Sequence, residues 1–304
     1  MSPAITLFLE LVAVYILMTW ALYLPFKAGQ LFNGPVYTMA VGGYTAAYCV
    51  QSLGWPLPAA LALAVVLAAF FGFIPALGFA RTRGIATAMG SIALIFIVQS
   101  VLMNLDFLGG PAGIKRLPRL SYLLPMAYGF VVVIGVLLSR LERSRMGRAM
   151  EAIAADADFA GTMGVSVSWV NVAALTVASA IGGIAGVIYT FVIRSIQPTT
   201  FGFTLLLYVW AMLFVGGRYT MWGAVVAAPL LWGLPQLLPG QATSYTRIIL
   251  GCLLAIVIVA APNGIISRDL VNRVSSVLSR APHDGDQTRA RATLTQREEE
   301  GEDV

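Results

Sequence analysis

The sequence predicts an all-α integral membrane protein with about nine transmembrane helices. Only 11% of its 304 residues are charged, whereas 59% are hydrophobic. A soluble domain carries about 25% charged residues, because its surface must be solvated by water. Before Arg81 the acidic and basic side chains are limited to Glu10 and Lys27. Most of the molecular surface therefore faces something other than water.

Apolar stretches of about 20 residues recur along the chain, and this length spans a hydrocarbon core of roughly 30 Å. The predicted spans are residues 5–24, 34–53, 57–80, 86–105, 122–138, 168–192, 203–216, 222–238 and 246–262. They define a transmembrane domain over residues 1–266. Residues 267–304 form a polar cytoplasmic tail that ends in QREEEGEDV, a composition typical of disorder.

The second span is the least regular. Gly34-Pro35 stands at its start and Gly42-Gly43 in its middle. Irregular backbone is tolerated at membrane depth only where protein or a water-filled cavity covers it. We expect either a broken or re-entrant helix here, or a Gly-rich helix that packs tightly against its neighbours.

The positions of basic residues predict the orientation, because loops rich in Lys and Arg stay in the cytoplasm. The strongest cluster lies between the fifth and sixth spans and contains Arg140, Arg143, Arg145 and Arg148. Placing this loop inside gives an N-out, C-in topology.

This cytoplasmic loop, at about residues 140–167, has the composition of a short amphipathic helix from Gly147 to Phe159. Its apolar stripe combines residues at helical spacing: Met150, Ile153, Ala157 and Ala160. Gly161 and Gly164 then end the helix before the chain returns to the membrane. Such a helix must bury its stripe against the lipid interface or against the groove of a partner protein.

The loop sequence RSRMGRAMEAIAADADFAGTMGVS resembles the coupling loop of branched-chain amino acid type ABC importer permeases, the LivM-like subunits. Six further segments resemble the family's motifs in the same order: GPVYTMAVGGYTAAY, RTRGIATAMGSIAL, NLDFLGGPAGI, SAIGGIAGVIYTFVIRSIQPTTFGF, GGRYTMWGAVVAAP, and LPQLL with APNGI. The similarity covers nearly all of residues 25–266. One arginine of the family's loop is absent here, and Arg218-Tyr219 replaces a usual pair of small residues.

The resemblance implies an importer subunit in the bacterial cytoplasmic (inner) membrane that forms half of a path for a small polar or zwitterionic solute, such as a branched-chain amino acid. The implied partners are a second homologous permease in a heterodimer, two cytoplasmic ATPase subunits and a periplasmic or extracellular solute-binding protein, within the lipid bilayer and without nucleic acid. The chain lacks a G-x-x-x-x-G-K-[ST] phosphate loop, so it cannot be the ATPase itself. We expect ATP and Mg on the ATPase subunits and no cofactor on this chain.

The resemblance assigns ATPase coupling to the loop. We expect apolar docking contacts from Met150, Ile153 and Phe159. The charges at the rim of the contact are assigned to Arg145, Arg148, Glu151 and Asp156, and Gly164 ends the docking element.

Candidates for the substrate path are polar residues at membrane depth: Tyr44, Thr45, Gln99, Asn104, Thr176 and Ser179. For each of them the alternative role is a hydrogen bond between two helices, without contact to a solute. Small residues spaced by four predict close helix packing, which in lipid depends on small side chains. These are Ser179, Gly182, Gly183 and Gly186.

Two other classes of membrane protein fit the sequence less well. A stand-alone secondary carrier or channel, for a small neutral solute such as urea or an amide, would be expected to place ionisable groups at the membrane midplane, and the spans hold few. An intramembrane enzyme lacks a base, since the only histidine, His283, lies in the tail. No catalytic residue and no metal ligand is predicted.

Overall fold

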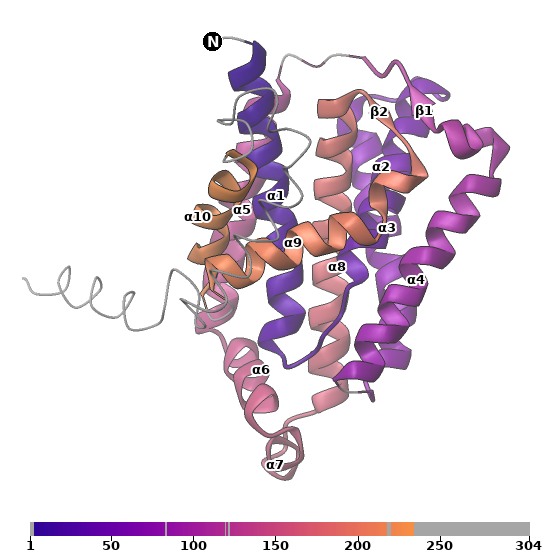
Figure 1. Ribbon diagram of the computed structural model, residues 1–304. Helices are drawn as coiled ribbons and strands as arrows, with labels where there is room; N and C mark the ends of the chain where they lie inside the picture. The colour runs from indigo at the N-terminus through magenta and orange to yellow at the C-terminus, as the bar shows by residue number, and fades with distance from the viewer. Residues whose placement is uncertain (1–2, 83, 119, 121, 218–219, 234–304) are drawn as a thin grey trace, which may run out of the picture. The chain divides into compact units, whose positions relative to one another are not determined.

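The computed structural model describes residues 3–82, 84–118, 120, 122–217 and 220–233. The predicted ninth span at 246–262, the end of the eighth span and the tail at 267–304 lie outside the described residues. The described part is mainly helical (Figure 1). Its two short strands, Ile114–Lys115 (β1) and Ser195–Ile196 (β2), pair antiparallel.

Five described helices are long and apolar enough to cross a membrane: α1 (Pro3–Lys27), α3 (Leu57–Phe79), α4 (Ile85–Asn104), α5 (Leu123–Arg143) and α8 (Val167–Ile193). Three shorter helices also fall on predicted spans: α2 (Gly34–Gln51), α9 (Phe203–Gly216) and α10 (Trp222–Gly233). This bears out a multi-pass, all-α membrane protein. The count of nine spans and the N-out, C-in orientation stay predictions.

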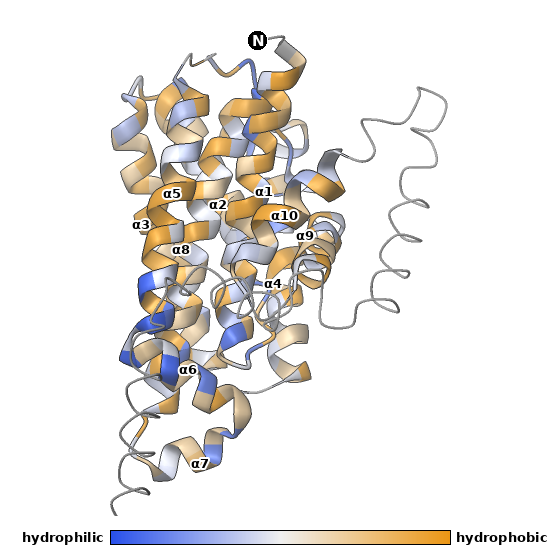
Figure 2. Cartoon of the chain, turned by 90° about the vertical axis from the view of Figure 1, so that its left-hand side faces the viewer, coloured by the Kyte–Doolittle hydropathy of each residue, from blue (hydrophilic) through white to orange (hydrophobic). Residues whose placement is uncertain are grey.

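The remaining described elements are short. They are the helices α6 (Arg145–Ala155) and α7 (Ala157–Thr162) and the 3-10 turns η1 (Asp106–Leu108), η2 (Gly110–Ala112) and η3 (Pro198–Phe201). In Figure 1, α6 and α7 lie at one end of the spanning helices, and β1 and β2 lie at the opposite end. Hydrophilic residues gather on α6 and on the adjoining end of α5, while the helices between the two ends are mostly hydrophobic (Figure 2).

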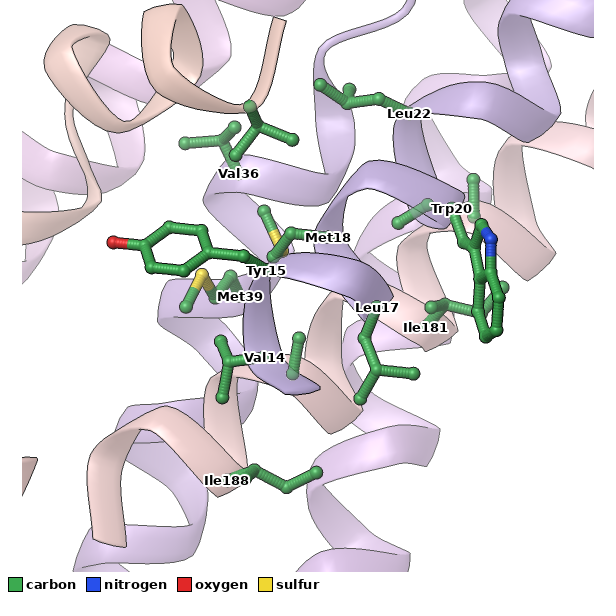
Figure 3. Close-up of a cluster of buried hydrophobic side chains, with 14 of the residues drawn as sticks. Val14, Tyr15, Leu17, Met18, Trp20, Leu22, Val36, Met39, Ile181 and Ile188 are labelled. Carbon is green, nitrogen blue, oxygen red and sulfur yellow. The ribbon is translucent and has the colours of Figure 1, made fainter. Parts of the chain in front are cut away.

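Helices α1 and α8 form the centre of this part of the chain. In each, 67% of the most apolar window is buried, against 22–28% for α3, α4 and α5. Side chains from α1, α2 and α8 form one cluster in Figure 3, among them Leu17, Met39 and Ile188. The peripheral helices α3, α4 and α5 keep large apolar side chains exposed, including Val66, Phe96 and Val132. Such faces suit contact with lipid rather than water.

The Gly-rich helix α2 is unbroken from Gly34 to Gln51, so of the two alternatives for this span the broken helix is wrong and the tightly packed Gly-rich helix is the one found. A Cβ added to Gly42 would lie 2.5 Å from the carbonyl oxygen of Gly183 on α8. A Cβ on Gly43 would lie 2.5 Å from Oγ1 of Thr190. These glycines therefore allow the two helix backbones to touch, which is the packing that small residues permit in lipid.

Helix α3 packs against α8 through its own stripe of small residues. Its buried positions recur at a spacing of about four: Leu57, Ala60, Ala64, Ala68, Gly72 and Ala76. The side chain of Ser179 on α8 fills the space that a Cβ on Gly72 would need. The small residues predicted for packing, Ser179, Gly182, Gly183 and Gly186, thus all lie at contacts within this chain, with α2 or α3.

Candidate functional site: the α6–α7 element and the α1–α2 connection

The α6–α7 element, residues 145–162, begins at a sharp corner after α5. The Ser144 hydroxyl caps α6 by accepting a 3.3 Å hydrogen bond from the backbone N–H of Gly147. A Cβ on Gly147 would lie 2.6 Å from the carbonyl oxygen of Glu142. Only glycine fits this corner without displacing the end of α5, so the direction of α6 is fixed by the chain itself.

Two short helices replace the single predicted helix over 147–159. Asp156 has an extended backbone and separates α6 from α7. Its Oδ1 atom accepts hydrogen bonds from the backbone N–H groups of Asp158 and Phe159, at 2.9 and 3.0 Å. Asp156 is thus the N-cap of α7, which is a preferred use of Asp because it satisfies otherwise unpaired N–H groups. Gly164 follows α7 with φ of +83°, where glycine is favoured.

The apolar stripe of α6 faces the chain's own helices. Met150 is 1% exposed and Ile153 is 6% exposed, and Ala160 of α7 is buried as well. The docking role predicted for Met150 and Ile153 is therefore corrected: their side chains stabilise the position of α6 and are not available to another protein. Of the three predicted apolar docking residues, Phe159 alone remains accessible, at 60% exposure.

Two further apolar side chains near Phe159 were not singled out from the sequence. Met163, just after α7, is 70% exposed, and Trp169, in the first turn of α8, is 66% exposed. In the sequence, Met163 lies near the end of the predicted loop and Trp169 just after it. Spacing alone does not show which side chains of a helix pair are buried and which are exposed. Arg145 and Arg148 are exposed too, and Nη1 of Arg148 donates a 3.1 Å hydrogen bond to the carbonyl oxygen of Arg143.

An ionic cluster ties α6 to α1 and α5. Nζ of Lys27 lies 3.3 Å from a carboxylate oxygen of Glu142 and 3.3 Å from one of Glu151. The hydroxyl of Tyr23 donates a 2.6 Å hydrogen bond to Glu142. The Lys27 side chain is only 10% exposed, so its charge is compensated by two carboxylates from different helices. Glu151, predicted as a rim charge, is thus one of the residues that hold α6.

The connection between α1 and α2, residues 28–33, carries a buried polar network. The Asn33 backbone N–H and Nδ2 both donate to Oγ of Ser91, each at 3.1 Å. Oδ1 of Asn33 accepts a 2.8 Å hydrogen bond from Nε1 of Trp210. Oε1 of Gln30 accepts one from Oγ1 of Thr87 at 3.2 Å. The connection is therefore bonded to both α4 and α9.

Non-helical segments among apolar helices need hydrogen-bond partners for their polar groups, because unpaired polar groups are costly there. This network supplies such partners. Gln30, Asn33, Thr87 and Ser91 are each at most 2% exposed. None of these four residues is among the six candidates for the substrate path. The Asn-Gly-Pro sequence at 33–35, which marks the start of a helix, was the indication available for Asn33.

The six candidates for the substrate path do not converge on one site. The hydroxyls of Thr176 and Ser179 donate to carbonyl oxygens of their own helix, those of Val172 and Leu175, each at 2.8 Å. The amide of Asn104 similarly donates to the carbonyl oxygen of Ser100 at 2.8 Å. For these three residues the expected interhelical hydrogen bond is corrected to one within the helix.

The other three candidates lie at contacts of α2 and α4. Gln99 is half-buried, and its Oε1 would lie 3.5 Å from a Cβ on Gly202, just before α9. Tyr44 and Thr45 line a groove of about 610 Å³ between α2, α3 and α4. Its walls are almost entirely apolar, with residues such as Leu67, Phe71 and Val98. Among the residues that the structure describes, no charged side chain lines the groove to pair with the ends of a zwitterion.

The described spans are also poor in charge. In α2, α3, α4, α8 and α9 no side chain is ionised at neutral pH. Charged residues gather instead at the end that holds α6 and α7. Apolar helices with central small-residue contacts, together with a folded polar element at one end, define a multi-pass, all-α membrane protein.

The chain belongs to the family described as "Branched-chain amino acid transport system / permease component", whose profile matches residues 4–258. This confirms the family resemblance of the loop and its accompanying motifs. The chain is 25% identical over 273 residues to the "High-affinity branched-chain amino acid transport system permease protein LivM" of Salmonella typhimurium, and equally so to that of Escherichia coli K12.

Each of these alignments covers 79% of this chain and 64% of the relative, so the chain spans less than two thirds of the length of the relatives. No solved structure was found to match the chain. The chain is a member of this permease family, and its activity, solute and partners are matters of proposal.

Proposed function

We propose that this chain is the membrane-spanning permease subunit of an ATP-driven ABC importer. It forms half of the path for a small polar or zwitterionic solute, for which a branched-chain amino acid is the leading candidate. The observation that carries the proposal is the α6–α7 element, a folded polar structure in a chain of the permease family. The relatives' name supports the choice of solute.

The docking surface proposed for the ATPase consists of the exposed side chains Phe159, Met163 and Trp169, which we name the α7 patch. Large apolar side chains exposed in a polar segment usually mark an interaction site. The α6–α7 element also carries charges of both signs, on Arg145, Arg148, Asp156 and Asp158. A segment of mixed charge suits a protein partner better than an anionic lipid surface, which attracts mainly basic residues.

The proposal includes the assembly and the location. Two ATPase subunits bind ATP and Mg on the cytoplasmic side, a second homologous permease completes the path, and a solute-binding protein delivers the solute from the other side. The chain lies in the bacterial inner membrane with α6 and α7 facing the cytoplasm. The apolar spans support a solute that is handed over in neutral or zwitterionic form rather than one moved with a proton.

The test is purification of the tagged chain from its native membrane, followed by reconstitution in liposomes. Two ATPase subunits and a second permease should co-purify, and tritiated leucine should enter only with ATP and the solute-binding protein. Phe159→Ser combined with Trp169→Ser should release the ATPase subunits. Val132→Ser, on the apolar face of α5, should retain them. Transport by the chain alone would overturn the proposal.

A further inference from the structure

The α1–α2 connection contacts the α6–α7 element at its start and the buried polar network at its end. At its start, Lys27 pairs with Glu151 of α6, and Gly29 lies so close to α6 that an added Cβ would be 3.0 Å from Cα of Ala154. At its end, Asn33 is bonded to Ser91 of α4 and Trp210 of α9. Few residues therefore separate the proposed docking element from contacts among the spanning helices.

The contact at Lys27 is specific in charge and in geometry. Gly29 has φ of +73°, so the chain turns sharply after α1, next to Ala154 of α6. Lys27 is nearly buried there, and its two carboxylate partners come from α5 and α6. Without the ammonium group, Glu142 and Glu151 would both lose the cation that they share. The lysine thus keeps α6 in contact with α1 and α5 together.

The contact at Asn33 is equally specific. Both polar atoms of its side-chain amide form hydrogen bonds: Nδ2 donates to Ser91 and Oδ1 accepts from Trp210. A shift of residues 28–33 along the helices would break at least one of these bonds. Because the groups are buried, a broken bond would leave a polar atom without a partner, which favours a small number of discrete arrangements over gradual displacement.

We propose that Lys27 is a positioning residue that links movement of the α6–α7 element to the helices α4 and α9. A displacement of α6 pulls on Lys27 through Glu151, and residues 28–33 carry it to Asn33 and Trp210. This inference rests on the proposed function, in which α6–α7 contacts the ATPase. It adds a route by which that contact reaches the spanning helices α4 and α9.

The test is the ratio of leucine transported to ATP hydrolysed, measured with the complete purified transporter in liposomes. Lys27→Met should keep the ATPase subunits bound and lower this ratio by roughly 3- to 30-fold. Lys27→Arg should restore most of it, because arginine keeps the charge between the two carboxylates. A loss of stability alone would lower transport and hydrolysis together and leave the ratio unchanged.

Glu151→Gln provides a second variant, since it leaves the Lys27–Glu142 pair in place and should lower the ratio in the same direction. The inference is overturned if both Lys27→Met and Glu151→Gln keep the ratio within about twofold of the native protein. It is also overturned if Lys27→Arg fails to recover the ratio that Lys27→Met loses. Failure of the native chain to co-purify with ATPase subunits would instead refute the proposed function.

Discussion

Nε1 of Trp210 donates a 2.8 Å hydrogen bond to Oδ1 of Asn33, although 177 positions separate the two residues in the sequence. The bond joins α9 to the start of α2. Asn33 also donates to Ser91, so one asparagine side chain holds three segments together. Because Asn33 is 1% exposed, each of these bonds replaces water that the side chain has lost on folding.

Trp210→Phe tests the value of this bond. The ring would keep its contacts with Phe26 and Phe214, but Oδ1 of Asn33 would lose its donor. We expect a loss of about 1–3 kcal/mol in stability, the range for an unsatisfied buried polar group. Thermal unfolding in detergent measures it. Trp222→Phe, at an exposed site, is the matched control and should unfold at the native temperature.

Ser91→Ala and Ser179→Ala compare a hydroxyl that bonds another segment with one that bonds only within its own helix. Both serines are fully buried, but Oγ of Ser91 accepts two hydrogen bonds from Asn33, whereas Ser179 bonds only its own helix. Ser91→Ala should cost about 1–3 kcal/mol, because two donors lose an acceptor. Ser179→Ala should cost less than about 1 kcal/mol. Equal unfolding midpoints for the two variants would contradict this assignment.

Gly42→Val tests the backbone contact between α2 and α8. The new side chain would enter the space held by Gly183, and overpacking of this kind costs about 1–3 kcal/mol. We expect a lower yield of folded protein and a lower unfolding temperature in size-exclusion and melting experiments. Gly129→Val is the control, because a Cβ on Gly129 of α5 meets open space. If both variants behave alike, the close approach of α2 and α8 is not important for stability.

Asp156→Ala tests the cap that starts α7. Removing the carboxylate leaves the N–H groups of Asp158 and Phe159 without their acceptor, and losing an N-cap costs about 1 kcal/mol. Hydrogen exchange of the amides in 157–162 should become faster. Asp156→Asn keeps a side-chain oxygen and should exchange at nearly the native rate. Unchanged exchange in Asp156→Ala would show that α7 does not depend on this cap.

The class and most helix positions could be predicted because both depend on composition along the chain. A lipid environment demands long apolar runs, and the runs at 5–24 and 168–192 correspond to α1 and α8. The break between α6 and α7 could not be predicted in the same way. Asp156 suits either an exposed position in one helix or the cap of a second, and tertiary contacts of Met150 and Ile153 decide between them.

The roles of individual polar residues were the least predictable part. Thr176 and Ser91 look alike in the sequence, as small hydroxyl residues within apolar runs. The Thr176 hydroxyl donates a hydrogen bond within its own helix, whereas the Ser91 hydroxyl accepts one from Asn33 in the α1–α2 connection. Which residue bonds a distant segment depends on how the helices pack, and the spacing of hydroxyl residues along one helix does not indicate that packing.

The central place of α1 has a consequence for biosynthesis. This helix is made well before α8, which begins at Val167 and is the helix that α1 contacts most. At about 5–20 residues per second, the ribosome needs on the order of ten seconds to produce the intervening chain. Throughout that interval Trp20 lies in the membrane without Met221, whose carbonyl oxygen accepts its Nε1 hydrogen bond in the folded chain. Slowing of translation before residue 167, or loss of an insertase that shelters α1, should therefore increase degradation of the newly made chain.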